Sequence, residues 1–262
     1  RVFMLDRPSH RKIHLMPLSQ NPGPPLIEAQ RNHLKTEKAL TRMRDLVAAE
    51  RRALPWLQVD KRYVFDAPDG ERTLGDLFGG NSQLVVHHLM FHPDWEAACV
   101  GCSFQADHID GPRPHLEQHD VSVAAVSRAP IGKIEAYRKR MGWSFPWVSS
   151  CRSDFNRDFH VTFGPDEVAS GRIDYNFGTI TVDPRYHSEE LPGISVFCRD
   201  GAGDIFLTQS IYARGLDLLI GASHYLDITP KGRNEADDPD WVRRHDEYEG
   251  AAADRCCEAA HA

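Results

Sequence analysis

The most constraining feature of this sequence is a largely apolar run, Gln83–Phe91, that leads by a short loop to the motif Cys99-Val-Gly-Cys102. The run is continuous rather than alternating, which is typical of a strand buried on both faces of a sheet. The residues after the motif have a helical pattern to about Asp110, where Gly111-Pro112 ends it. A fully buried strand that feeds a helix favours an α/β fold in which helices cover the sheet.

The rest of the chain alternates strands and helices in the same way. Apolar runs predict further strands, and helical periodicity follows Pro130 and again the last strand. An Asp-Gly turn between the last two strands indicates a β-hairpin. The predicted strands are Val121–Val126, Ser144–Val148, Gly193–Phe197 and Ile205–Thr208, and the predicted helices are Ile131–Met141 and Arg214–Tyr225. This order predicts a mixed sheet flanked by helices.

The N-terminal part does not share this alternation of strands and helices. Residues 1–25 carry basic side chains and a proline-rich stretch, and we expect them to pack loosely or to grip a partner subunit. From Ile27 to Leu54 a charged sequence with one apolar stripe predicts a long helix that Pro55 ends. Such a helix docks on its own domain or forms a homodimer. We therefore divide the chain into residues 1–55 (extension and helix), 56–235 (α/β domain) and 236–262 (polar tail).

Composition and charge exclude several classes of protein. The 262 residues have a formal net charge of −7, whereas nucleic-acid binding needs a basic surface. No run of about eighteen apolar residues occurs, so the sequence predicts no transmembrane helix. Six cysteines are too few for a disulfide scaffold in a chain of this length. We expect a cytoplasmic protein without nucleic-acid or membrane partners.

The six cysteines fall into three groups by their surroundings in the sequence. Cys151 and Cys198 are lone and predicted to be small buried side chains, while Cys256 and Cys257 lie in the polar tail. Cys99 and Cys102 flank the first turn of a predicted helix, where unpaired N–H groups and the helix dipole favour a thiolate. Cys99 is thus predicted to attack a disulfide, and Cys102, one turn later, to resolve the mixed disulfide.

A metal site is the alternative use of the same sulfurs. The chain has 14 histidines, several of them near the motif. His88 and His92 are the candidates to approach Cys99 and Cys102, and two thiolates with imidazole suit copper(I) or zinc. His87 points to the opposite face of the strand from His88, so the two cannot easily share one site. A third hypothesis is a non-catalytic adaptor that binds a partner protein.

Several long runs resemble a bacterial thioredoxin-like family of unknown function. They include Leu89–Trp95, the Cys99–Gly111 stretch, Met141–Ser150, Pro192–Phe197 and Tyr212–Leu219, and the resemblance covers about residues 28–248. It implies a thioredoxin-like sheet with an N-terminal helical extension and leaves the reaction open. In thioredoxin-like folds a cis-proline lies opposite the cysteines, which makes Pro192 a candidate substrate-binding residue beside Trp95. His87 and His92 depart from the family pattern and favour a metal in this member.

Three functions follow from these observations. The leading one is a thiol–disulfide oxidoreductase that acts on a small thiol or disulfide or on a protein disulfide. The second is a copper- or zinc-binding protein or metalloenzyme, and the third is the adaptor. No cofactor is required by the first hypothesis, whereas copper or zinc is required by the second.

Overall fold

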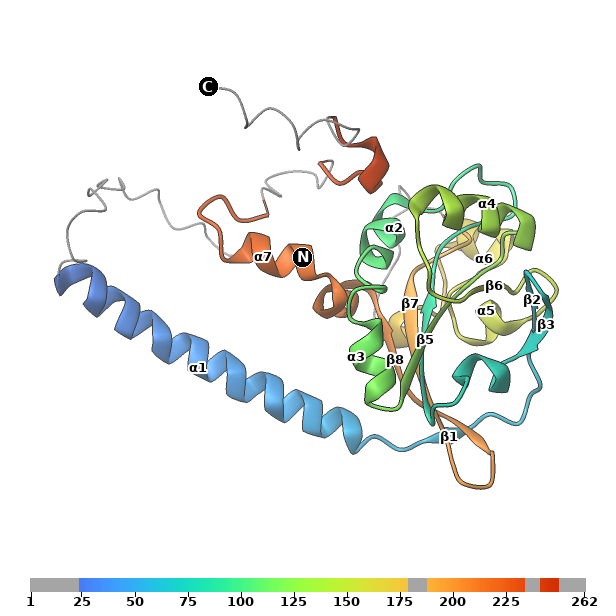
Figure 1. Ribbon diagram of the computed structural model, residues 1–262, viewed down its shortest axis with the longest axis horizontal. Coiled ribbons are helices and arrows are strands. Elements are labelled where there is room, and N and C mark those ends of the chain that lie inside the picture. The colour runs from blue at the N-terminus through green and yellow to red at the C-terminus, as the bar shows by residue number, and fades with distance from the viewer. Residues whose placement is uncertain (1–23, 179–187, 234–240, 250–262) are drawn as a thin grey trace. The chain divides into compact units, whose positions relative to one another are not determined.

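The computed structural model describes residues 24–178, 188–233 and 241–249 (Figure 1). The chain divides into two compact units, residues 1–53 and 54–262. The expectation that residues 1–25 pack loosely or bind a partner subunit concerns a segment that lies almost wholly outside the described residues. None of the described helices is long and apolar enough to cross a membrane.

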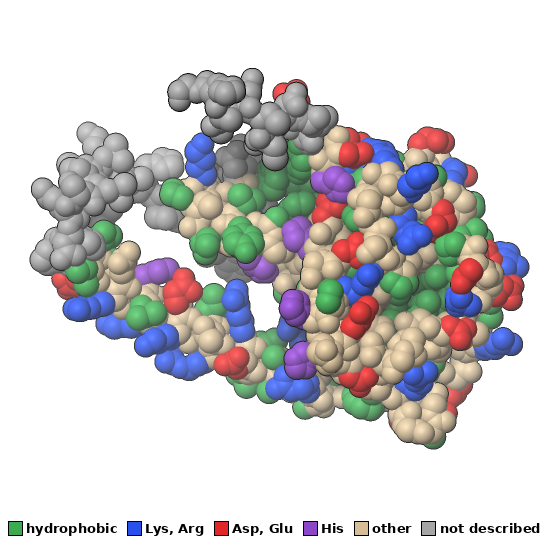
Figure 2. Space-filling view, viewed as in Figure 1, with side chains coloured by type: hydrophobic (Ala, Val, Ile, Leu, Met, Phe, Trp, Pro, Cys, Tyr) green, Lys and Arg blue, Asp and Glu red, His purple; other side chains and the backbone are tan. Residues whose placement is uncertain are grey.

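The first unit contains one long helix, α1 (Pro24–Arg52). Its sequence is rich in Ala, Glu, Lys, Arg and Leu, which favour helix, and prolines at its start need no helical N–H partner. Leu34, Met43 and Leu46 are about half exposed on it, and Figure 2 shows apolar side chains beside basic ones along this helix. The predicted helix is therefore present, while the homodimer stays a prediction.

The second unit is built on one mixed sheet of eight strands. Their order across the sheet is β1-β8-β7-β4-β5-β6-β2-β3. β4 is central and pairs parallel with β5 on one side and antiparallel with β7 on the other, and β8 pairs antiparallel with β7. The strands are β1 (Leu57–Gln58), β2 (Val64–Ala67), β3 (Gly70–Thr73), β4 (Gln83–His88), β5 (Val121–Ser127), β6 (Trp147–Ser149), β7 (Gly193–Arg199) and β8 (Ile205–Tyr212).

The order β8-β7-β4-β5, with a helical crossover between β4 and β5 and a hairpin between β7 and β8, is that of the thioredoxin-like fold. The fold class is therefore confirmed. The described helices of this unit are α2 (Val100–Ala106), α3 (Arg113–Gln118), α4 (Ile131–Met141), α5 (Phe155–Asp158), α6 (Pro165–Ser170) and α7 (Gly221–Asp227).

Some predicted boundaries were wrong. The helix expected at Arg214–Tyr225 is a 3-10 turn, Ala213–Leu219, followed by α7, because Ile220 has an extended ψ of 87° that interrupts the helical backbone. The helices α3, α5 and α6, which span only four to six residues, were not predicted. Helices this short lack the repeats of apolar spacing on which a prediction depends.

Two apolar clusters fill the two faces of the sheet. One contains Leu84 and Val86 of β4 with Phe155 of α5. The other contains Leu89 and Ala125 with Cys102 of α2 and Ile134 of α4. Alternate residues of β4 therefore point to different clusters, and the motif cysteines belong to the α2 side of the sheet.

Candidate active site

Cys99 is held at the junction between the loop after β4 and helix α2. It occupies the position before the first helical residue, with φ −51° and ψ 136°. Its N–H donates to the carbonyl of Met90 at 3.0 Å, and its own carbonyl accepts from the N–H of Ser103 at 2.9 Å and from the Ser103 hydroxyl at 2.8 Å. Cys99 is partly exposed, whereas Cys102 is buried with 2% of its surface exposed. One sulfur is thus accessible and the other sheltered.

The pKa values of the two thiols are shifted in opposite directions. The Cys99 sulfur accepts a hydrogen bond from the Cys102 thiol, and although burial opposes this, the N–H groups of Cys102 and Gly101 and the charge of Arg244 help to lower the Cys99 pKa to about 6. The pKa of Cys102 is raised well above its usual range, because its proton is shared with Cys99 and because it is buried. The arrangement provides a thiolate at Cys99 and a protonated thiol at Cys102 near neutral pH.

This difference predicts the pH dependence of alkylation. Because the thiolate is the reacting form, the rate at which iodoacetamide modifies Cys99 should rise with pH and reach half its maximum near pH 6, while Cys102 stays unmodified. Peptide mass spectrometry of samples quenched at each pH measures both residues, and the exposed Cys151 serves as an internal comparison. A midpoint for Cys99 at or above about 8.5, the value of a free cysteine, would contradict the assignment.

A buried acid lies at the same edge of the sheet as the cysteines. Glu190 precedes β7, whose first residue Gly193 pairs with His88 at the end of β4. The Glu190 carboxylate is 2% exposed and accepts hydrogen bonds from Arg128 at 2.7 Å and Thr162 at 2.9 Å. Burial outweighs both partners and raises the Glu190 pKa to about 7. Its negative charge in turn adds to the raised pKa of Cys102.

The two predicted substrate-binding residues lie near this edge. Trp95 packs against the apolar cluster that contains Cys102, and it is partly exposed. Pro192 lies directly before β7, and its carbonyl accepts a hydrogen bond from the Tyr175 hydroxyl at 2.7 Å. The described residues contain no cis peptide bond, so the cis geometry considered for Pro192 is wrong. The segment runs extended here, with the Leu191 N–H bonded to the Val161 carbonyl at 2.9 Å.

The residue after Pro192 must be glycine for steric reasons. A Cβ at Gly193 would lie 2.9 Å from Val161 Cγ1 and 3.1 Å from the Tyr212 ring, which is closer than carbon atoms normally approach. The close packing brings the start of β7 against its neighbours and so fixes the position of Pro192 at the sheet edge.

The predicted metal ligands do not come together. His88 Nε2 lies 2.8 Å from the Ser195 hydroxyl and its ring packs on Phe155 and Phe159, on the other face of β4 from Cys102. His92 Nδ1 accepts from the Asp94 N–H at 3.2 Å. Among the described residues there is no group of three or more His, Cys, Asp or Glu side chains that could hold a metal ion. The physical reason is strand alternation, which directs His88 away from the cysteines.

Two other predictions about side chains need correction. His87, on the α2 side of β4, is 1% exposed, and neither ring nitrogen has a hydrogen-bond partner among the described residues. Burial lowers its pKa to about 4, so it is a neutral core residue at neutral pH. Cys151 is exposed and Cys198 is partly exposed, although both were expected to be buried. Each lies near the surface end of its strand or loop rather than in an apolar cluster.

Sequence reasoning missed the contribution of residues 241–248, which we call the C-terminal strap. This segment was expected to be part of a polar tail, but it docks on α2 and α4. The Trp241 ring meets the Phe104 ring edge-on with centroids 5.8 Å apart, and Arg244 donates to the Ala98 carbonyl at 2.7 Å. Two signals in the sequence could have indicated it: a large aromatic, Trp241, in a polar stretch, and the family resemblance, which extends to about residue 248.

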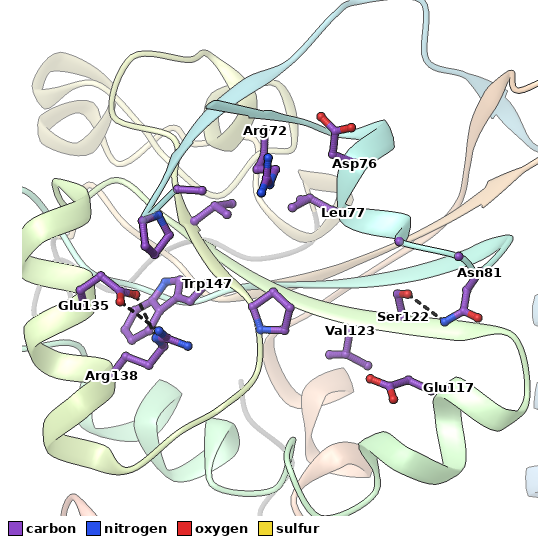
Figure 3. Close-up of a pocket in the computed structure, with 16 residues that line it drawn as sticks. Arg72, Asp76, Leu77, Asn81, Glu117, Ser122, Val123, Glu135, Arg138 and Trp147 are labelled. Carbon is purple, nitrogen blue, oxygen red and sulfur yellow. Dashed lines mark hydrogen bonds and ion pairs between the residues drawn. The ribbon is translucent and has the colours of Figure 1, made fainter. Parts of the chain in front are cut away.

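A cavity lies away from the cysteines, at the amino ends of β5 and β6 (Figure 3). It has a volume of about 530 Å³ and is lined by mixed charges that include Arg72, Asp76, Glu117 and Glu135. The Arg138 guanidinium at its rim is already paired with Glu135 at 2.9 Å. No reactive sulfur lines it, so this cavity is not the thiol site.

Comparison with known proteins gives one family and several solved structures. The family described as "Bacterial protein of unknown function (DUF899)" matches residues 25–248, and the chain matches no curated protein. A mutant PrxQ from Xylella fastidiosa is 14% identical, with a TM-score of 0.42 over 62% of this chain and 88% of that chain. Peroxidoxin BcpB from Mycobacterium tuberculosis is also 14% identical, with a TM-score of 0.43 over 64% and 94% of the two chains.

Proposed function

The chain belongs to this bacterial family of unknown function, and we propose that it is a thiol–disulfide oxidoreductase. The observation that carries the proposal is the pairing of a partly exposed thiol of low pKa, Cys99, with a buried thiol of high pKa, Cys102, three residues later. A thioredoxin-like sheet supports both residues.

The reaction has two exchange steps. In the first, the Cys99 thiolate attacks one sulfur of a disulfide RS–SR; the S–S bond of the substrate breaks, a Cys99–SR bond forms, and RS⁻ leaves. In the second, Cys102 loses its proton and attacks the Cys99 sulfur, which releases the second RS⁻ and forms the Cys99–Cys102 disulfide. The substrate gains two electrons and the protein dithiol loses two, so a dithiol reductant must restore the protein for each turnover.

Proton transfer in the second step is assigned to Glu190. Once Cys99 is part of a mixed disulfide, its sulfur no longer carries the negative charge that accepted the Cys102 proton. The carboxylate of Glu190 is buried at the same sheet edge, acts electrostatically on Cys102, and has a pKa near 7. An acid–base group with a pKa close to the ambient pH is suited to accept a proton and return it.

The proposal includes a cytoplasmic location and a small or protein disulfide as substrate. The four cysteines within the described part of the chain are all free thiols. Thiols of this kind persist in the cytosol, where glutathione and thioredoxin keep them reduced. Trp95 and Pro192 are the residues proposed to contact the substrate beside Cys99.

A single-turnover oxidation tests the function. A variant that keeps only Cys99 and Cys102, with the other four cysteines replaced by serine, is reduced and mixed with oxidised glutathione. We expect one intramolecular Cys99–Cys102 disulfide and two equivalents of glutathione per chain, measured by intact-protein mass spectrometry and thiol assay. Persistence of both thiols, or glutathione held on both cysteines, would contradict the proposal.

A further inference from the structure

The C-terminal strap is fastened to the α2 and α4 side of the molecule at several points. Arg140 of α4 pairs with Asp246 at 2.6 and 3.0 Å and with Glu247 at 2.9 Å. His245 Nδ1 lies 2.7 Å from Asp107, just after α2, and the same carboxylate accepts from Trp143 Nε1 at 2.8 Å. These contacts hold the segment in one position against the helix that carries the cysteines.

Arg244 is the strap residue that reaches the thiol site. One end of its guanidinium donates to the carbonyl of Ala98, the residue before Cys99, at 2.7 Å, and the other end pairs with Glu247 at 3.0 Å. Its side chain is 17% exposed, and its buried Nε has no partner among the described residues. A permanent cation is therefore bonded to the residue that precedes the attacking cysteine, and its bonds to Ala98 and Glu247 set its orientation.

Other cations near the cysteines are engaged elsewhere. Arg128 is paired with Glu190, and the Lys133 ammonium donates to the carbonyls of Pro93 and Trp95 at 2.8 and 3.2 Å, which shapes the loop before Cys99. The planar guanidinium of Arg244 presents separate N–H groups to Ala98 and to Glu247 in a fixed geometry, which a compact lysine ammonium does not reproduce.

We propose that Arg244 is a positioning residue of the dithiol site and that the docked C-terminal strap is therefore part of the active site. Arg244 holds the Ala98–Cys99 backbone in place and stabilises the Cys99 thiolate by its charge. The inference rests on the proposed function, since it concerns the sulfur that attacks the substrate. It also means that the α/β domain alone, without the strap, lacks part of its catalytic machinery.

The test measures the pH midpoint of Cys99 alkylation in the full chain, together with thermal unfolding. Arg244→Met should raise the midpoint by about one pH unit and slow alkylation at pH 6 about fivefold. Arg244→Lys, which keeps the charge, should shift it less. Arg140→Ala, which removes an anchor of the strap, should shift it in the same direction. The matched control is Arg214→Met, a surface arginine that is 79% exposed, and it should change nothing.

The outcomes separate a positioning role from a structural one. An Arg244 that only stabilised the fold would lower the unfolding temperature and leave the midpoint unchanged, and that result in folded Arg244→Met would overturn the inference. If Arg244→Met fails to fold, an unchanged midpoint in Arg140→Ala would overturn it instead. Oxidation of Arg244→Met by glutathione disulfide distinguishes the two proposals: disulfide formation with an unshifted midpoint rejects only the role of Arg244, whereas no disulfide in the unaltered protein rejects the function.

Discussion

Replacing Cys99 by serine should lower the rate of disulfide reduction by roughly a thousandfold or more, because the attacking thiolate is lost. A serine hydroxyl is not ionised near neutral pH and does not form a bond to sulfur in a disulfide exchange. The partly exposed position of Cys99 and its pKa of about 6 single it out as the first nucleophile. The measurement is the rate of oxidised glutathione consumption with dithiothreitol as the dithiol reductant, corrected for the reaction without protein.

Two matched variants accompany this experiment. Cys102→Ser keeps the first step but removes the second, so it should accumulate a mixed disulfide on Cys99 that mass spectrometry detects. Cys151→Ser changes an exposed thiol away from the site and should retain the full rate. A Cys99→Ser protein that consumes glutathione disulfide as fast as the unaltered protein would show that another group is the nucleophile.

The second large effect is expected in the pH dependence of stability. The Glu190 pKa is raised by burial from 4.5 to about 7, so between these values the folded state holds a proton that the unfolded chain has released. The favourable contribution of Glu190 is complete below pH 4.5 and is lost as pH rises through 7. The loss amounts to about 3 kcal/mol in the free energy of unfolding.

Comparison with Glu190→Gln isolates this contribution. Glutamine keeps the shape and cannot ionise, so the difference in unfolding free energy between the unaltered protein and the variant should shift by about 2.5 kcal/mol in favour of the variant from pH 5 to pH 8. The unaltered protein must be compared with the variant because His87 and His88 also affect the pH dependence. Burial lowers the pKa values of both histidines, so their contribution to stability increases as pH rises, opposite to that of Glu190. Urea unfolding at each pH gives the free energies.

The neighbouring acid provides the control for this measurement. Glu189 is 35% exposed, and its charge is only the last of the causes that set the Glu190 pKa. Glu189→Gln should therefore weaken the pH dependence of stability only slightly. A pH profile for Glu190→Gln parallel to that of the unaltered protein would mean that Glu190 is ionised at the same pH in both states. The proton assigned to it in the second exchange step would then need another acceptor.

Much of the fold was predictable because its signals are local. The continuous apolar run became β4, the run Val121–Val126 became β5, and the Asp-Gly turn joins β7 to β8. These signals depend on the side chains of neighbouring residues alone. By contrast, helices of four to six residues such as α3, α5 and α6 escaped prediction, since they are stabilised by what they pack against rather than by their own periodicity.

The candidate site was predictable only in part for the same reason. The spacing of Cys99 and Cys102 and their place after β4 predicted the candidate reactive pair. The histidine ligands proposed beside them did not come together, because the alternation of β4 sends His88 to the opposite face. The strap was not predicted because a docked segment with polar side chains has the same sequence pattern as a solvated tail.

The sequence by itself determined that two cysteines stand at a strand-to-helix junction of an α/β chain, since hydrophobic continuity and residue spacing are properties of a short stretch. Their order at the start of the helix also predicted Cys99 as the attacking thiol, and only the tertiary structure decided which groups set the two pKa values. The acidity depends on the direction of the Cys102 thiol and the charges of Glu190 and Arg244. Glu190 and Arg244 lie far from the motif along the chain, and only folding brings their charges close enough to act on the sulfurs.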